Sequence, residues 1–298
     1  MVFNNEKDGC KKLTDLLALF LNTLIPLYRN MTSGKLGMMV CPMLEDEMIY
    51  NLLSDKDEKD VYLLDNIFTK TIIPKLNKNK IKFTVLNERD YLDNRIDIPD
   101  DKFSVIIWMM DLGLHEEPEN LKNKIRELLI EFQDRIDSVM LYYGRCGKGL
   151  DGIEDWGKEF LTVPVTIMKD RKGQVCDDCV CVPIGGTENY LKLLRKYPGI
   201  MYFTPAMSCN FEEFLDRMEL FKGVDKNDKD MFKMVLEMAD YKYVMEIQTG
   251  LGDQEHFHKC TEEFAEKYNL QVKQLEDGWV SSDVADLSYA EAKDKLNV

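Results

Sequence analysis

A short glycine-rich stretch around one cysteine is the part of this sequence best suited to do chemistry. An apolar run at residues 138–143 predicts a buried strand that stops at Gly144, after which Gly144, Gly147 and Gly149 bracket Cys146. Glycines at a strand end permit a left-handed backbone and close approach, so this turn could present Cys146 and its backbone N–H groups to a ligand. Ligands of open parallel sheets bind at the carboxyl ends of strands, and we expect the chemistry here.

Further soft metal ligands follow other predicted strands. Cys41 and His115 each come after an apolar run, and Cys179 lies in a loop that leads to a predicted helix. If these strands are parallel neighbours, their carboxyl ends converge with Cys146. Three thiolates and an imidazole suit tetrahedral zinc, whereas three thiolates alone could hold an iron–sulfur cluster with one open iron. Cys176 forms a C-x₂-C pair with Cys179, a spacing that suits metal chelation or redox exchange.

These cysteines also have plainer interpretations. Free cysteine is among the most buried residue types, so Cys41 could simply fill the core. His115 could cap the following helix instead of ligating an ion. Cys146 could act as a nucleophilic or methyl-accepting thiolate, which makes it the candidate catalytic residue.

The glycine-rich turn could alternatively bind an anion, because Arg145 and Lys148 flank its backbone N–H groups. It lacks the G-x-x-x-x-G-K-[ST] pattern of a nucleotide P-loop. A second glycine-rich turn, Thr249–Asp253, follows an apolar run, and its Asp253 suits the cap of a helix beginning at Gln254. The candidate cofactor-binding residues are Gly144, Arg145, Gly147, Lys148, Gly149, Gly250 and Gly252.

The elements that position these residues alternate between strand and helix. That alternation predicts an α/β fold with a mostly parallel sheet of strand–helix units. Leucines at helical spacing predict an added amphipathic helix at residues 10–30, which could pack on the domain or mediate oligomerisation or partner docking. We therefore divide the chain into an N-terminal extension, 1–34, and an α/β domain, 35–298, which could comprise two lobes, about 35–150 and 151–298. The predicted strands are 35–40, 62–64, 82–86, 103–109, 138–143, 160–168, 200–203, 243–248 and 271–275, and the predicted helices are 119–133, 188–195, 210–221, 228–239, 254–268 and the C-terminal residues.

Composition narrows the classes of partner. The 298 residues carry a net charge of −15, which argues against nucleic acid and anionic membranes, since both attract basic surfaces. The most apolar stretch, residues 17–27, is too short to span a bilayer, and no secretory leader is visible. We expect a cytoplasmic protein whose eight cysteines stay reduced, which favours metal binding or catalysis over disulfides.

Four signatures in this order resemble the family known as domain of unknown function 1638. They are Val40-Cys-Pro-Met-Leu44, Gly113-Leu-His-Glu-Glu-Pro118, Leu141-Tyr-Tyr-Gly-Arg-Cys-Gly-Lys-Gly-Leu150 and Thr249-Gly-Leu-Gly-Asp253. The resemblance covers roughly residues 35–280. It departs from the usual pattern at Arg145 and Lys148, where apolar and amide residues are typical, and at Asp177, where a histidine is.

The resemblance implies an α/β protein of the kind found in methanogens and acetogens beside corrinoid-dependent methyltransferase genes. We therefore expect a metal- or iron–sulfur-binding protein of one-carbon metabolism, with a corrinoid as a further candidate cofactor. A thiolate enzyme acting at Cys146 and a non-catalytic partner of a corrinoid or methyltransferase protein are the alternatives, so whether the protein is an enzyme stays open.

Overall fold

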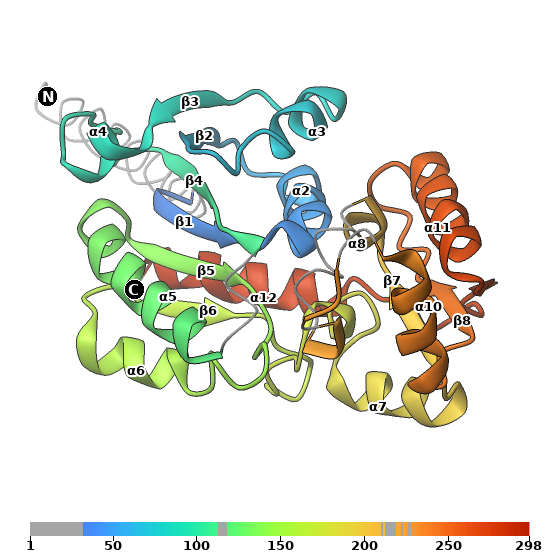
Figure 1. Ribbon diagram of the computed structural model, residues 1–298. Coiled ribbons are helices and arrows are strands. Elements are labelled where there is room, and N and C mark those ends of the chain that lie inside the picture. Colours follow the sequence, from blue (N-terminus) through green and yellow to red (C-terminus); the bar gives the residue numbers. More distant parts are fainter. Residues whose placement is uncertain are drawn as a thin grey trace, which may run out of the picture.

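The computed structural model describes residues 32–112, 118–209, 211, 219–221, 223–225 and 228–297. The predicted N-terminal helix at 10–30 lies outside these residues, as do His115 and most of the predicted helix at 210–221. The described chain forms two sheets with helices packed around them (Figure 1).

The larger sheet confirms the predicted fold class. It has six strands in the order β3-β2-β4-β1-β5-β6, and every pairing within it is parallel. The central strands are buried on both faces, which is why they appear in the sequence as continuous apolar runs. The strands are β1 (Gly34–Val40), β2 (Asp60–Asp65), β3 (Thr84–Asn87), β4 (Phe103–Met109), β5 (Ser138–Tyr142) and β6 (Val165–Ile167).

Helices cover both faces of this sheet. One face packs against α2 (Glu45–Ser54), α3 (Ile72–Lys78) and α12 (Asp283–Asp294), which share a single apolar cluster with it. The other face packs against α4 (Glu88–Leu92), α5 (Pro118–Phe132) and α6 (Ile153–Phe160). Short 3₁₀ turns occupy Pro42–Leu44, Gln133–Arg135, Cys179–Cys181, Glu219–Phe221 and Lys295–Asn297.

The strand order creates two places where the connections that leave two neighbouring strands diverge, each leading away from the other strand. After β1 and β2 the chain moves towards β3 over the face covered by α2 and α3. After β4 and β5 it moves towards β6 over the face covered by α5 and α6. Because β2 neighbours β4 and β1 neighbours β5, a crevice is expected at the carboxyl end of each of these two pairs.

A smaller sheet follows in the second half of the chain. Its three parallel strands lie in the order β7-β8-β9, and one of its faces shares the apolar cluster of α5 and α6. The division into lobes near residue 150 stays a prediction, but the larger sheet extends to Ile167 and α12 returns to it. The elements of this half are β7 (Ile200–Phe203), β8 (Tyr243–Glu246), β9 (Gln271–Gln274), α7 (Thr187–Lys196), α8 (Pro205–Cys209), α10 (Lys229–Met238) and α11 (Gln254–Tyr268).

Several helices were missed by the sequence analysis, α4 and α6 among them. The predicted strand at 160–168 is confirmed only as the short β6, and residues 153–160 form α6. Gly157 obscures the helical pattern, yet it has a packing role. A Cβ atom at Gly157 would lie 2.7 Å from a methyl carbon of Val165, so glycine allows α6 to approach β6 closely.

Candidate functional site

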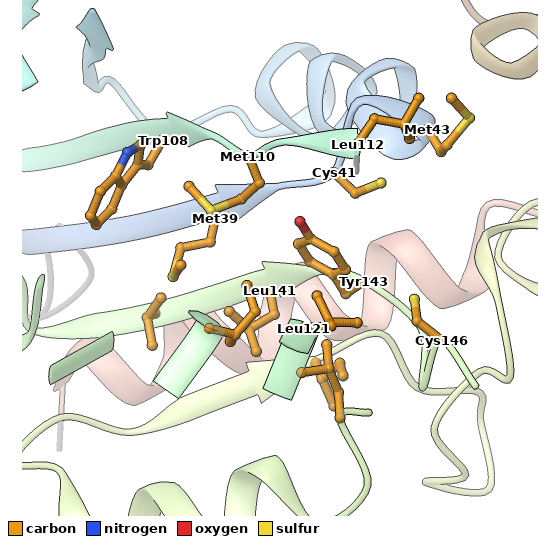
Figure 2. Packing of buried hydrophobic residues seen from close by; sticks show 14 of the residues in the cluster. Met39, Cys41, Met43, Trp108, Met110, Leu112, Leu121, Leu141, Tyr143 and Cys146 are labelled. Carbon is orange, nitrogen blue, oxygen red and sulfur yellow. The ribbon is translucent and has the colours of Figure 1, made fainter. Parts of the chain in front are cut away.

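Three cysteines from separate segments lie near the carboxyl ends of β1 and β5, where the strand order predicts a crevice. Cys41 follows β1 directly, and its N–H donates to Tyr142 O at the end of β5, 3.3 Å away. Cys146 lies in the turn after β5, and Cys179 begins a 3₁₀ turn that packs against it. Figure 2 shows Cys41 and Cys146 close to Tyr143, the residue that follows β5.

The three thiols affect one another electrostatically. Burial raises the pKa of the Cys41 thiol to about 12. Burial also raises the pKa of Cys146 well above its usual value, and the neighbouring Cys41 raises it further. For Cys179 the same two causes act, with Asp178, Cys41 and Cys146 all adding to the effect of burial. The structure therefore brings Cys41, Cys146 and Cys179 within mutual electrostatic range.

The glycine-rich turn is held against the segment that carries Cys179. Gly144 allows this contact, because a Cβ atom there would lie 2.8 Å from Cys176 O and 2.9 Å from Asp178 Cα. Arg145 N–H donates to Cys176 O over 2.7 Å, and Cys146 N–H donates to Asp177 O over 3.0 Å. Cys146 itself has a left-handed backbone with φ of 46°.

These contacts change the expected role of the turn. Two of the N–H groups expected to face an anion donate to protein carbonyls instead. The Arg145 guanidinium is also engaged, since it contacts Asp151 at 2.6 Å and Asp177 at 3.1 Å. Gly147 and Gly149 lie against Pro118, where a Cβ atom on Gly149 would meet Pro118 O at 2.6 Å. Lys148 is exposed. Close packing explains why glycine occupies positions 144, 147 and 149. The backbone N–H groups and the guanidinium on which the anion-binding interpretation depended are already engaged by other protein groups.

Cys176 lies apart from the three crevice thiols, whereas Cys181 acts electrostatically on both Cys146 and Cys179. Cys176 and Cys181 belong to the apolar cluster on the α2 and α12 face of the sheet, and Cys146 belongs to the cluster on the opposite face. Burial raises the pKa of Cys176, and its nearest thiol influence is Cys181. The C-x₂-C pair therefore spans two environments, and only Cys179 of the pair joins the crevice.

A buried acidic cluster next to the crevice was missed by the sequence analysis. Glu45, Asp46 and Glu47 begin α2 and are 1%, 4% and 5% exposed, although acidic residues at a helix start normally face water. Lys75 from α3 lies 2.8 Å from both Glu45 and Asp46. Although burial alone would lower the pKa of Lys75, these two carboxylates raise it. The signal in the sequence was three consecutive acids placed directly after a buried strand and a Cys-Pro step.

Glu47 has the most unusual environment of the cluster. Burial, and then the charge of Asp46, raise its pKa to about 8. It borders a cavity of about 260 Å³ that is also lined by Thr249 and Leu251 of the second glycine-rich turn. Gly252 lets this turn approach the cluster, because a Cβ atom there would lie 2.9 Å from an Asp46 oxygen. Gly250 has a left-handed backbone and open space around it.

Asp253 and His258 both belong to the start of α11. The Asp253 side chain accepts a hydrogen bond from His256 N at 3.1 Å, which confirms it as the cap of α11. The His258 side chain is 47% exposed, and its Nδ1 lies 2.8 Å from the fully buried carboxylate of Glu246. That carboxylate raises the pKa of His258.

The described residues contain no group of three His, Cys, Asp or Glu side chains already arranged to hold a metal ion. Three soft thiols suit zinc or iron by their chemistry, so an ion in this crevice would require the side chains to turn towards one another. His115, the predicted fourth ligand, lies outside the described residues. Among the helices that the structure describes, none has the length and apolarity needed to cross a membrane.

The fold and the crevice define an α/β protein that presents cysteines at the carboxyl edge of a parallel sheet. A family model described as Protein of unknown function (DUF1638) matches residues 109–280, more than half of the chain. The chain belongs to this family, and the resemblance noted from its signatures is confirmed. The match includes Cys146, Cys179 and the second glycine-rich turn, whereas Cys41 precedes it. Searches of curated proteins and of solved structures found no match.

Proposed function

We propose that this protein binds a soft metal ion or an iron–sulfur cluster through Cys41, Cys146 and Cys179. The observation that supports the proposal is that three thiols from segments far apart in the chain lie within electrostatic range of one another near the carboxyl edge of the sheet. Thiolates are the preferred ligands of zinc and of iron–sulfur clusters. His115 remains the proposed fourth ligand.

Burial favours metal binding over a free nucleophile. Cys41 is 1% exposed and Cys146 is 8% exposed, whereas reactive cysteines are partly exposed and lie in electropositive surroundings. The Arg145 charge next to the turn is balanced by Asp151 and Asp177, so it offers Cys146 little activation. A bound metal would stabilise these thiolates and release their protons.

The wider role rests on the family resemblance. We propose that the protein works in the cytoplasm in corrinoid-dependent methyl metabolism, with a corrinoid or methyltransferase protein as its partner. A thiolate enzyme acting at Cys146 is the alternative. In either case, if a corrinoid binds directly, adding the protein should change the absorption spectrum of cobalamin. An unchanged spectrum would exclude direct corrinoid binding and leave a protein partner as the connection to methyl metabolism.

Metal analysis of protein purified without oxygen tests the site. Cys41→Ala, Cys146→Ala and Cys179→Ala should each lose a stoichiometric metal that the wild type retains. Cys260→Ala is the matched control, because Cys260 is also 8% exposed but lies on α11. Cys176→Ala should keep the metal, since Cys176 lies in the opposite cluster.

Circular dichroism of each variant would separate metal loss from unfolding. The proposal fails if the wild type purifies without metal and takes up neither zinc nor iron. It also fails if folded variants of the three crevice cysteines keep the metal, or if Cys260→Ala loses it equally.

A further inference from the structure

A second cavity lies at the other point where neighbouring strands diverge, between β2 and β4. It has a volume of about 670 Å³, within the range of small-molecule sites. Asn66 follows β2 and Met110 follows β4, so both line it from the carboxyl edge of the sheet. Asn123 and Leu128 of α5 form the facing wall.

The walls of this cavity are mainly apolar. Phe68, Trp108, Met110 and Leu128 line it together with Ile67, whose side chain is 75% exposed. Trp108 is only 3% exposed and packs edge-to-face on Phe132, with ring centroids 5.2 Å apart (Figure 2 shows Trp108 on its strand). Trp108 is therefore fixed in position and can hold Glu88 in place, while the exposed apolar surface of the wall comes from Ile67.

One carboxylate is fixed inside these walls. Glu88 Oε2 accepts hydrogen bonds from Trp108 Nε1 at 2.8 Å and from Asn66 Nδ2 at 2.9 Å. Asn66 is itself held, because it donates to Met109 O at 3.0 Å and accepts from Phe68 N at 2.9 Å. Both hydrogen bonds to Glu88 end on Oε2, and we assign its Oε1 to a ligand.

The charges of the lining favour a positive ligand. Glu88, Asp111 and Glu127 are acidic, and Lys124 is the basic residue of the lining. Lys124 Nζ lies 2.9 Å from Glu127 Oε1, so its charge is largely offset by that carboxylate. The formal charge of the lining residues is negative, which attracts cations and disfavours anions.

We propose that this cavity binds a small aromatic or heteroaromatic cation. Its ring would pack against the apolar lining that includes Ile67, Phe68 and Leu128, and its positively charged N–H donor would bond to Glu88. Charge-assisted hydrogen bonds of this kind supply orientation as well as affinity. The proposal concerns a different crevice from the three cysteines and does not depend on metal binding.

Three probes of similar size and different charge test the proposal: benzamidine, benzyl alcohol and benzoate. Calorimetry or ligand-observed NMR with the full chain should show benzamidine binding with a Kd on the order of millimolar, as expected for so small a ligand. Benzyl alcohol should bind more weakly, and benzoate should not bind measurably. Failure of benzamidine to bind, or benzoate binding as well as benzamidine, would overturn the proposal.

Three variants locate the binding. Glu88→Gln keeps a hydrogen-bond acceptor for Trp108 and should weaken benzamidine roughly tenfold while leaving benzyl alcohol unchanged. Glu131→Gln is the matched control, because Glu131 is a carboxylate of the facing helix α5 that lies outside the lining, and this variant should bind like the wild type. Asn123→Trp, at an exposed position on the wall, should block both ligands by filling the cavity. Unaltered benzamidine binding in Glu88→Gln or in Asn123→Trp would refute the assignment.

Cys146→Ala separates this inference from the proposed metal site. Benzamidine binding should persist in that variant even when its metal is lost. Loss of benzamidine binding together with the metal would contradict the independence of the two crevices and would reject the cavity as a separate site.

Discussion

Replacing Gly144 with alanine should disrupt the contact that holds Cys146 against the segment carrying Cys179. The new Cβ atom would lie 2.8 Å from Cys176 O and 2.9 Å from Asp178 Cα, and real Cβ atoms do not approach backbone so closely. Neither neighbour is a flexible side chain, so one of the two backbone segments must move.

The expected cost has two main parts. Overpacking of this kind costs about 1–3 kcal/mol. The movement also weakens the hydrogen bonds from Arg145 N to Cys176 O and from Cys146 N to Asp177 O, worth about 1 kcal/mol each. Alanine also lowers the conformational entropy of the unfolded chain, which stabilises the folded protein by roughly 0.7 kcal/mol. We therefore expect Gly144→Ala to lower the free energy of unfolding by about 3 kcal/mol.

Gly152→Ala is the control for this change. Gly152 has φ of 66° and no heavy atom within 4 Å of the position that a Cβ atom would take, so alanine there meets backbone strain without a clash. An alanine in the left-handed region costs about 1–2 kcal/mol of stability. The lower conformational entropy of the unfolded chain with alanine offsets about half of that cost. Urea unfolding monitored by circular dichroism compares the two variants. A Gly144→Ala protein no less stable than Gly152→Ala would refute the packing account of the turn.

The acidic cluster gives three further predictions, each measured by urea unfolding. The pKa of Glu47 in the folded protein, about 8, exceeds its usual 4.5, so its contribution to stability is fully present below pH 4.5 and is lost as pH rises to about 8. Glu47→Gln should remove up to ~4 kcal/mol of that pH-dependent loss, and an unchanged pH slope would contradict it. Lys75→Met should lower the free energy of unfolding by about 3 kcal/mol, because the buried carboxylates of Glu45 and Asp46 lose their cation. An unchanged free energy of unfolding would mean that these carboxylates are solvated. Gly252→Ala should cost more than Gly250→Ala, since both are left-handed but only Gly252 lies against Asp46; equal costs would remove that contact from the argument.

Local patterns predicted the elements well where burial or capping was strong. The run Phe103–Met109 is buried throughout as β4, and its predicted bounds are confirmed. The helix beginning at Gln254 is also confirmed with its Asp253 cap. Both signals are local, because a strand buried on two faces needs continuous apolar residues and a helix start needs an acceptor for its first N–H groups.

The environment of individual side chains was harder to predict than the position of helices and strands along the chain. Cys41, Cys146 and Cys179 were expected together, and the three thiols lie within electrostatic range of one another. The C-x₂-C spacing added Cys176 to the predicted ligands, but Cys176 lies in the apolar cluster on the opposite face of the sheet. The burial of Glu45–Glu47 was also missed, because it depends on Lys75 and on a turn near residue 252, both distant in sequence.

The strand order itself explains why two separate crevices are available. A sheet in which the chain reverses direction once has one crevice at its carboxyl edge. Here β4 is inserted between β2 and β1, so the reversal occurs at β2–β4 and again at β1–β5. Thiols lie near the β1–β5 position, and a carboxylate held by Trp108 lies at the β2–β4 position. The two positions therefore suit ligands of different chemistry. Met110, directly after β4, donates its N–H to the carbonyl of Val40 at the end of β1 over 2.9 Å. The paired strands β1 and β4 therefore separate the two positions. This arrangement follows from long-range pairing of strands, which the spacing of residues along one chain does not specify.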